Sequence, residues 1–232
     1  MIFYYQLVFQ HGLILMNNLN ILYEDNHIIV AIKPYNVLSQ ADNTKDLDML
    51  NIIKQYLKEK YKKPGNVYLG LVHRLDRPTS GVMVFAKTSK AAKRLSESIK
   101  NNELTKEYIL VCHGKLNNNG IMEDYIDKKD KKGFISKNGK YASLEYTLLK
   151  YNKDRDLSLV KVKLNTGRHH QIRVQFASKS HPLYGDNLYG RGEQTPLCLT
   201  ATKLEFIHPV KKDLMTFNYD IDYSMEGYSF FK

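Results

Sequence analysis

The sequence predicts an α+β fold with a mixed, largely antiparallel sheet flanked by helices. Apolar, β-branched segments outnumber amphipathic helical segments, and the two kinds do not alternate strictly along the chain. Two consecutive strand-like runs, at 142–150 and 157–164, are joined by a short polar connection, which favours an antiparallel hairpin. Hydrophobic residues make up 43% of the 232 residues and charged residues 25%, values that are typical of a globular protein with a buried core.

Short apolar runs closed by polar residues, glycine or proline predict the strands. They lie at 28–32, 81–86, 108–112, 142–150, 157–164, 197–206 and 214–219. Apolar residues at helical spacing predict an amphipathic helix over 46–61. Ser89 is the predicted N-cap of a second helix that continues to about Ile99, and a third helix is expected to begin around Arg168.

The chain is strongly basic. Its 35 Lys and Arg residues against 24 Asp and Glu residues give a net charge of +11, which favours a polyanionic partner. The two cysteines, Cys112 and Cys198, exclude a disulfide framework and a four-cysteine zinc site. No apolar run approaches the roughly 18 residues that span a bilayer. We therefore expect a soluble, cytoplasmic protein that does not bind a membrane.

The N-terminal segment differs from the rest of the chain. Residues 1–16 are apolar and aromatic and contain no Lys or Arg, whereas a secretory signal has a positive start and a small-residue cleavage site. Met16 is a second plausible start. The segment is either an extra edge strand or an extension outside the fold. We expect 1–19 to be an N-terminal extension and 20–232 to be one large domain or two closely joined subdomains.

A loop at 73–81, with the sequence HRLDRPTSG, is the first candidate site. It carries four ionisable residues and lies between two apolar segments, and reactive groups often lie on loops that a rigid scaffold holds. Arg74 and Arg77 bracket Asp76, and nearby cations favour an ionised carboxylate. An ionised, positioned Asp can act as a nucleophile. The alternative is an Arg–Asp pair that only stabilises a turn.

The second candidate site is the segment 164–176, LNTGRHHQIRVQF. In a helix, His169 and His170 would lie on the same side as Arg173, because they precede it by four and three positions. Two neighbouring histidines cannot both face one ion from a helix, and no Glu follows at the spacing of a zinc helix, so no metal is expected. Contacts to phosphates and to a carboxylate suit these residues better.

A run of charged residues at 127–140 contains six lysines against two aspartates. It is predicted to be either a solvated loop or a loop that contacts phosphates. The lysines with the second role would be Lys128, Lys129, Lys131 and Lys132.

Five segments occur in a characteristic order: HRLDRPTSG, TKEYILVCHG, LNTGRHHQIRVQF, HPLYGDNLYG and LTATKLEFIHP. Together with the opening ILYEDNHIIVAIKP, they resemble the RluA family of RNA pseudouridine synthases over roughly residues 20 to 219. The resemblance implies the pseudouridine synthase fold, with a catalytic cleft across its sheet, and isomerisation of uridine to pseudouridine. It implies no cofactor and no metal. Some relatives carry a small RNA-binding module before the catalytic domain, and the chain is expected to lack it, with 20–232 as the catalytic domain.

The resemblance also implies roles for individual residues. Asp76 matches the catalytic nucleophile, and Arg173 matches the basic residue that pairs with it and keeps it ionised. Tyr108 matches the tyrosine that packs on the target base and is proposed to assist proton removal from carbon 5. Arg74 matches the arginine that enters the helical stack in place of the flipped nucleotide. The family usually has Thr where this chain has His169, and often His where it has Cys198.

The expected partner is structured RNA, either ribosomal RNA or transfer RNA, bound by a monomer that needs no obligatory protein partner. The residues expected to contact RNA are His73, Arg74, Arg77, Lys128, Lys129, Lys131, Lys132, Arg168, His170 and Gln171. Two other functions stay open from the sequence. One is an RNA-binding protein without activity on the same fold, and the other is a hydrolase with Asp76 as its nucleophile, although no metal-binding carboxylate cluster accompanies it.

Overall fold

The structure, a computed structural model, describes residues 19–44 and 46–232. The expected edge strand or extension at 1–16 lies outside these residues. The described chain forms two compact units. The first comprises the residues up to Leu104 together with Phe206–Phe217, and the second comprises Thr105–Glu205 together with Asn218–Lys232. Strands outnumber helices among the described residues, as the α+β prediction requires.

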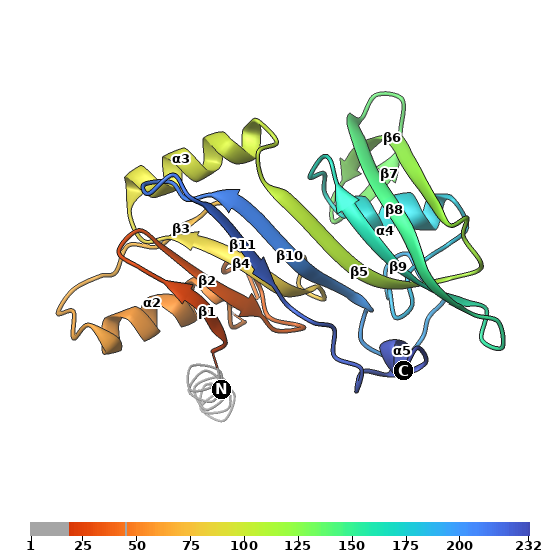
Figure 1. The fold of residues 1–232 in the computed structure, drawn as a ribbon, viewed down its shortest axis with the longest axis horizontal. Coiled ribbons are helices and arrows are strands. Elements are labelled where there is room, and N and C mark those ends of the chain that lie inside the picture. Colours follow the sequence, from red (N-terminus) through yellow and green to blue (C-terminus); the bar gives the residue numbers. More distant parts are fainter. Residues whose placement is uncertain (1–18, 45) are drawn as a thin grey trace. The chain divides into compact units, whose positions relative to one another are not determined.

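The first unit contains strands paired antiparallel and two long helices. Its elements are β1 (Ile21–Glu24), β2 (Ile28–Lys33), α2 (Met49–Lys60), β3 (Gly70–Leu71), β4 (Ser80–Ala86), α3 (Ser89–Lys100) and the start of β11 (Leu214–Asn218). Strand β2 pairs with β1 on one side and β4 on the other, and β3 also pairs with β4. Figure 1 shows α2 and α3 running along these strands. All of β2 is buried, which explains its continuous apolar sequence.

Each helix of the first unit begins at a side chain that accepts a hydrogen bond from the first turn. Asp48 accepts from the N–H of Asn51 at the start of α2. At the start of α3, Thr88 accepts from the N–H of Ala91. The prediction of Ser89 as N-cap was therefore wrong by one residue. Thr88 has the extended backbone of an N-cap, whereas Ser89 is already helical.

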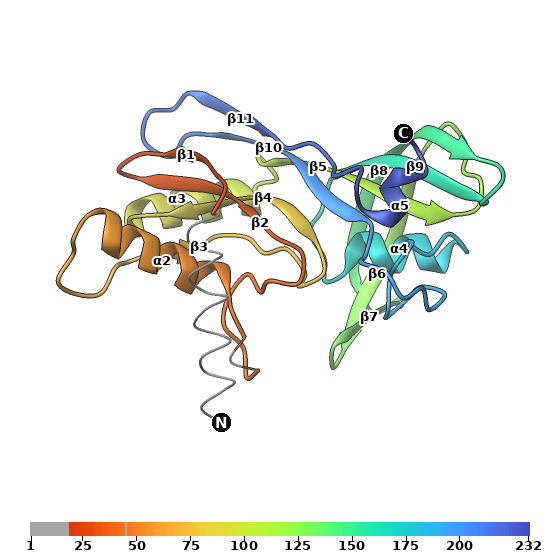
Figure 2. The ribbon, with the colours of Figure 1, turned by 90° about the horizontal axis from the view of Figure 1, so that it is seen from below.

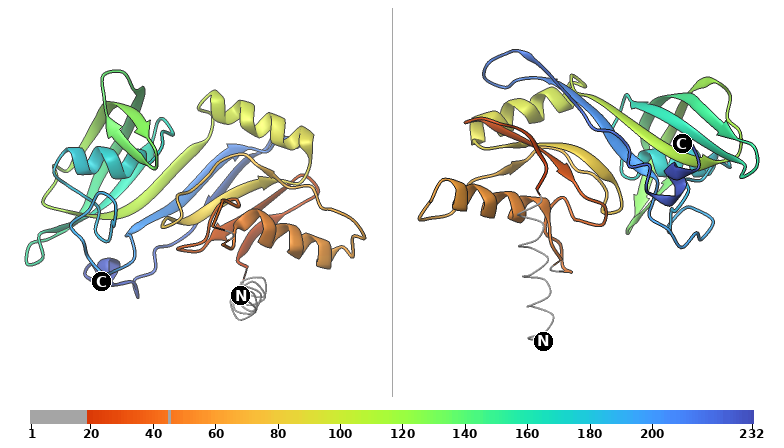
Figure 3. Two further views of the ribbon diagram at one scale, coloured as in Figure 1. Left: turned by 180° about the vertical axis from the view of Figure 1, so that it is seen from behind. Right: turned by 60° about the horizontal axis from the view of Figure 1, so that its bottom comes forward.

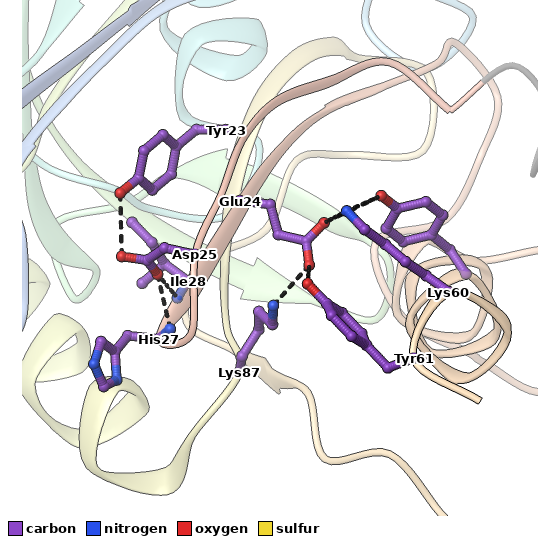
Figure 4. Close-up of polar contacts among 9 residues, drawn as sticks. Tyr23, Glu24, Asp25, His27, Ile28, Lys60, Tyr61 and Lys87 are labelled. Carbon is purple, nitrogen blue, oxygen red and sulfur yellow. Dashed lines mark hydrogen bonds and ion pairs between the residues drawn. The ribbon is translucent and has the colours of Figure 1, made fainter. Parts of the chain in front are cut away.

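A buried carboxylate at the end of β1 connects three elements of the first unit (Figure 4). Glu24 accepts hydrogen bonds from Lys60 of α2, from Tyr61 just after α2, and from Lys87 just after β4, each at 2.7 Å. Burial raises the pKa of Glu24, but the hydrogen bonds from Lys60, Lys87 and Tyr61 outweigh it and hold the pKa at about 2. The ionised Glu24 thus fastens α2 to the strands.

We expect Glu24→Gln to lower the free energy of unfolding by about 1.5–3 kcal/mol at pH 7, because it weakens hydrogen bonds to a charged acceptor. A lowered folded-state pKa gives stability that is present above the unfolded pKa of 4.5 and is lost as pH falls toward about 2. The difference between wild type and variant should therefore shrink from pH 5 to pH 2. Urea denaturation at several pH values measures it, and a constant difference across this range would contradict this role of Glu24.

The second unit is a larger antiparallel sheet with two short helices. Its elements are β5 (Thr105–His113), β6 (Asn119–Lys129), β7 (Lys132–Ile135), β8 (Lys140–Asn152), β9 (Leu157–Leu164), α4 (Gln171–Ser178), β10 (Leu199–Ile207), whose last two residues belong to the first unit, and α5 (Glu226–Ser229). The strand order is β10-β5-β9-β8-β6-β7. Strands β8 and β9 form the antiparallel hairpin that the sequence predicts. Figures 2 and 3 show α4 lying beside β6 and β7.

The predicted loop at 127–140 is instead mostly the hairpin of β6 and β7. Lys129 pairs with Lys132, and Asp130 in the turn has a left-handed backbone with φ 53°. The prediction missed β6 because its exposed residues are mainly polar. Only Met122 and Ile126 are buried along this strand, on the side that packs against α4.

The C-terminal segment completes the core of the second unit. Tyr228 of α5 is fully buried, and its hydroxyl donates to the carbonyl of Ile109 at 2.9 Å. Its ring packs with Val111 of β5 and with Leu157 and Leu159 of β9. Among the described residues, no helix is long and apolar enough to cross a membrane.

Candidate functional site

The backbone on both sides of Asp76 is fixed by side chains from elsewhere in the first unit. Ser39 contacts both backbone groups of Leu75: its hydroxyl donates to the carbonyl at 2.7 Å and accepts from the N–H at 3.1 Å. The carbonyl of Asp76 accepts from the N–H of Thr79 at 2.9 Å and closes a turn. On the other side, the Lys33 ammonium donates to the carbonyl of Arg77 at 3.0 Å. The loop therefore presents Asp76 from a rigid backbone.

Lys33, at the end of β2, is 0% exposed. Its Nζ also donates to the carbonyls of Val37 at 2.6 Å and Pro34 at 3.0 Å, so three backbone carbonyls surround one ammonium group. Burial lowers the pKa of Lys33 to about 7; the charge of Asp76 opposes this shift and that of Arg77 adds to it. The buried head group of Lys33 thus lies against the backbone of the loop that carries Asp76.

We expect Lys33→Met to lower the free energy of unfolding by about 1–3 kcal/mol, because buried carbonyls lose their donor. The sign of the pH dependence follows from the lowered pKa. The unfolded chain binds more protons than the folded chain between pH 7 and 10.5, so Lys33 makes stability rise with pH there. Thermal denaturation at pH 6, 7, 8 and 9 should show a larger deficit of the variant at pH 9 than at pH 6. Parallel curves would contradict this burial of the charge.

The other ionisable residues of the loop, Arg77, His73 and Arg74, have different surroundings. Arg77 donates to Asn36 at 2.8 Å and to Asp46 at 2.7 Å, so these contacts link the loop to the segment before α2. The Nε2 atom of His73 accepts from the N–H of Val84 in β4 at 3.1 Å. Of these three, only Arg74 is exposed, whereas His73 and Arg77 are half-buried.

In the second unit, Arg173 of α4 is buried against another carboxylate. Its Nε and Nη2 atoms donate to the two oxygens of Asp186 at 2.7 and 2.6 Å, a bidentate pair. Burial raises the pKa of Asp186, but the hydrogen bonds and charge of Arg173 outweigh it and keep the pKa below its ordinary value. Gly185, just before it, has φ +77°, and an added Cβ would lie 2.3 Å from the carbonyl oxygen of Pro196. Only glycine fits there.

Tyr108 lies in the middle of β5, where its neighbours across the ladders are Val162 of β9 and Ala201 of β10. The residue is buried, which is consistent with a ring held in one orientation. Its position on a central strand of this unit is set by the pairs on both sides.

Helix α4 begins later than predicted. His170 has a left-handed backbone, with φ 52°, so the helix starts at Gln171 and the two histidines precede it. The prediction that they share the side of Arg173 on a helix was wrong, because this backbone conformation interrupts the helical period. The buried Gln171 side chain fixes the start: it accepts from the N–H of Arg168 and the hydroxyl of Thr166, and it donates to the carbonyl of Ser143.

Tyr189 joins the start of α4 to the β6–β7 hairpin. Its hydroxyl accepts from the N–H of Gly133 at 2.8 Å and lies 2.8 Å from Nδ1 of His170. Its ring lies 5.1 Å from the guanidinium of Arg173. The ring of His169 stacks on that of His170, and its Nε2 lies 3.2 Å from the carbonyl of Lys131. The structure thus brings the backbone of the β6–β7 hairpin, at Lys131 and Gly133, next to the residues at the start of α4.

Sequence reasoning missed four residues that contact predicted site residues or their loops: Lys33 and Ser39 in the first unit, and Asp186 and Tyr189 in the second. Asp186 and Tyr189 lie in HPLYGDNLYG, which reads as an ordinary tight loop when it is taken alone. The sequence offers one sign that Lys33 is buried: this lysine ends a run of otherwise apolar residues, 28–32. Within the described residues, no group of three or more His, Cys, Asp or Glu side chains could hold a metal ion.

A family model described as RNA pseudouridylate synthase matches residues 27–178. The chain belongs to this family. RNA pseudouridylate synthases are isomerases that convert uridine to pseudouridine in RNA, so the family expected from the five sequence segments is confirmed.

Curated proteins of several bacteria are similar to this RNA pseudouridylate synthase. An uncharacterized RNA pseudouridine synthase of Aquifex aeolicus (strain VF5) is 35% identical over 215 residues, which cover 86% of this chain and 68% of the relative. The ribosomal large subunit pseudouridine synthase D of Yersinia pestis is 34% identical over 213 residues, covering 83% of this chain and 64% of the relative. The chain thus spans about two thirds of the length of these relatives.

Two solved structures share the fold of this RNA pseudouridylate synthase. The structure titled Human RNA Pseudouridylate Synthase Domain Containing 4 has a TM-score of 0.77 at 21% identity, covering 96% of this chain and 95% of that one. Human RNA Pseudouridylate Synthase Domain Containing 1 has a TM-score of 0.72 at 22% identity, covering 92% and 87%. These similarities confirm the predicted α+β pseudouridine synthase fold.

Proposed function

We propose that this protein isomerises a specific uridine to pseudouridine in structured RNA, with Asp76 as the nucleophile. The observation that carries the proposal is the family match over residues 27–178, which contains Asp76, Tyr108 and Arg173. The hydrogen bonds that hold the backbone on both sides of Asp76 support the proposal, because a nucleophile needs a defined position relative to its substrate.

The proposed reaction breaks the bond between N1 of uracil and C1′ of ribose and forms a bond between C5 and C1′. Asp76 attacks the target uridine and forms a transient covalent bond with it. The detached base rotates and rejoins the ribose through C5, and the bond to Asp76 breaks, which returns the free carboxylate. A proton leaves C5 and N1 gains one, so the product has the same composition as the substrate. The reaction needs no cofactor and no metal.

Two residues of the second unit complete the proposal. The ring of Tyr108 packs on the target base, and its hydroxyl assists removal of the proton from C5. A phenol has an ordinary pKa near 10, so this second role requires help from its surroundings. Arg173 supplies the positive charge that favours the ionised form of the nucleophile. The bidentate contact to Asp186 supports the role of Arg173, since it fixes where the guanidinium lies.

Base flipping is part of the proposal, because the reacting atoms of uridine are inaccessible inside a stacked helix. Arg74 takes the place of the flipped nucleotide, as a planar cation can stack between bases and also contact phosphate. Its exposure is what such a role needs. His73, Arg77, Arg168, His170, Gln171 and the hairpin lysines are proposed to contact the surrounding RNA.

Ribosomal RNA is the first substrate to test, and transfer RNA is the alternative. The relative from Yersinia pestis is named for the ribosomal large subunit. We further propose that the protein acts in the cytoplasm, as a monomer and without an obligatory protein partner.

Chemical mapping of pseudouridine identifies the substrate. Ribosomal RNA and transfer RNA transcripts are incubated with the purified protein, treated with a carbodiimide that marks pseudouridine, and read by reverse transcription. We expect stops at one or a few positions of a single RNA class. The absence of new stops in both classes would contradict the proposed function, while stops in transfer RNA alone would replace ribosomal RNA as the substrate.

A further inference from the structure

Three aromatic side chains lie exposed on one face of the second unit's sheet. Tyr125 of β6, Phe134 of β7 and Tyr141 of β8 are 52%, 42% and 43% exposed. Tyr125 pairs directly with Tyr141, and Asp127 pairs with Phe134. Residues two apart in a strand share a face, so all three rings project from the same side. We call these three residues the aromatic face.

The aromatic face is not needed for the core. The opposite side of the same strands is the buried one, where Ile126 and Ala142 pack against Val174 of α4. Two of the exposed rings, those of Tyr125 and Tyr141, contact neighbouring side chains. The hydroxyl of Tyr141 donates to Glu123, and its ring meets that of Tyr125 edge-on, with the centroids 5.9 Å apart. Exposed rings gathered on adjacent strands form an apolar patch of the kind that marks interaction sites.

Charged residues of both signs lie at the aromatic face. Two carboxylates share it: Glu123 accepts from the hydroxyl of Tyr141, and Asp127 accepts from the N–H of Lys128. Positive charge borders it. Lys129 and Lys132 pair across the hairpin on the same side as the rings. Arg168 lies at the other edge, where its Nε donates to the carbonyl of Tyr141 at 2.7 Å. Protein interfaces are depleted in lysine, whereas surfaces that bind single-stranded nucleic acid combine aromatic rings with basic residues. The segment 127–140 still carries six lysines against two aspartates, and this excess beside exposed rings favours an RNA strand over a protein partner.

We propose that the aromatic face binds a single-stranded segment of RNA, with its bases stacked on Tyr125, Phe134 and Tyr141 and its phosphates near Lys129 and Lys132. The proposal rests on the proposed function in that RNA is the substrate, and it adds a contact with bases outside the reaction itself. Stacking is available to every base, so this contact extends the RNA footprint without selecting a sequence.

Binding of a 12-nucleotide oligoadenylate tests the proposal, since this RNA holds no uridine and cannot be isomerised. A fluorescent label on the RNA reports the Kd for wild type, Tyr125→Ala, Phe134→Ala and the matched control Tyr223→Ala, an exposed tyrosine outside the face. We expect each variant of the aromatic face to weaken binding about 5- to 150-fold, the range for loss of one stacking contact. Tyr223→Ala and binding of a 12-base-pair RNA duplex should stay unchanged.

Tyr125→Leu separates stacking from folding, because it keeps an apolar side chain but removes the ring; it should weaken binding like Tyr125→Ala while the melting temperature stays near wild type. Unchanged affinity in all variants would overturn the proposal. An equal loss of duplex binding would overturn it as well. So would a wild-type dimer that Phe134→Ala converts to a monomer, since the aromatic face would then bind a second copy of the chain. If the wild-type protein does not isomerise uridine but the variants of the aromatic face still lose oligoadenylate binding, the proposed function is refuted and this inference is not.

Discussion

Replacing Asp76 with Asn is expected to lower the turnover number by at least about 10⁴-fold, because removal of a nucleophile eliminates the covalent step. Asn is close to Asp in size, and the contacts that hold the loop involve the backbone of its neighbours. Ser39 would still bind Leu75, and Lys33 would still donate to the carbonyl of Arg77. The loop should therefore keep its conformation.

RNA binding separates this expectation from a general loss of folding. The Kd for substrate RNA should change less than about threefold in Asp76→Asn, since the charge of one carboxylate contributes little to phosphate contacts. Asp42→Asn is the control for a neutralised carboxylate; Asp42 accepts hydrogen bonds from Thr44 in an exposed turn. Single-turnover kinetics and filter binding make both measurements. Turnover of Asp76→Asn within tenfold of wild type would exclude Asp76 as the nucleophile.

The second large effect is expected at the buried pair of Arg173 and Asp186. Asp186→Asn should lower the free energy of unfolding by about 3–5 kcal/mol, since it leaves a buried guanidinium without its carboxylate. Because the folded-state pKa of Asp186 is lowered, this stability is present above the unfolded pKa of 3.8 and is lost as pH falls below it. The difference between variant and wild type, measured by urea denaturation, should therefore decrease below pH 4.

A double variant distinguishes the structural from the catalytic role of Arg173. Replacing both partners by apolar residues, as in Arg173→Met with Asp186→Leu, should recover most of the lost stability, because no charge is left buried without a partner. It should not recover activity. Arg173→Lys should lose activity as well, since one ammonium group cannot form the bidentate contact. Recovery of activity in the double variant would show that Arg173 acts only in folding.

Much of the fold could be predicted from local patterns. The continuous apolar run of β2 and the alternating apolar and polar residues of β9 predict strands. The polar connection between β8 and β9 predicts a hairpin. The β6–β7 hairpin was missed, because charged side chains on its exposed residues hide the alternation. The start of α4 was misplaced because nothing in the sequence marks the left-handed backbone of His170.

The site was only partly predictable for a different reason. Asp76, Tyr108 and Arg173 are recognised from segments that resemble a family. Chemistry alone makes only Asp76 a candidate nucleophile, beside the alternative of an Arg–Asp pair that stabilises a turn. Lys33 and Ser39 hold the Asp76 loop from 44 and 36 positions away in sequence. Contacts of this kind depend on tertiary packing, which no local pattern encodes. The same holds for Tyr189, which contacts Gly133 from 56 positions away.

Nucleoside analysis of ribosomal RNA tests the central claim most directly. The RNA is incubated with purified wild-type protein or with Asp76→Asn, without an added cofactor, then digested and separated by chromatography. The proposed isomerisation predicts that wild-type protein produces pseudouridine in an amount equal to the uridine lost, and that Asp76→Asn produces none. Unchanged nucleoside composition with wild-type protein, on both ribosomal RNA and transfer RNA, would contradict the claim that this chain is an active pseudouridine synthase on these RNAs.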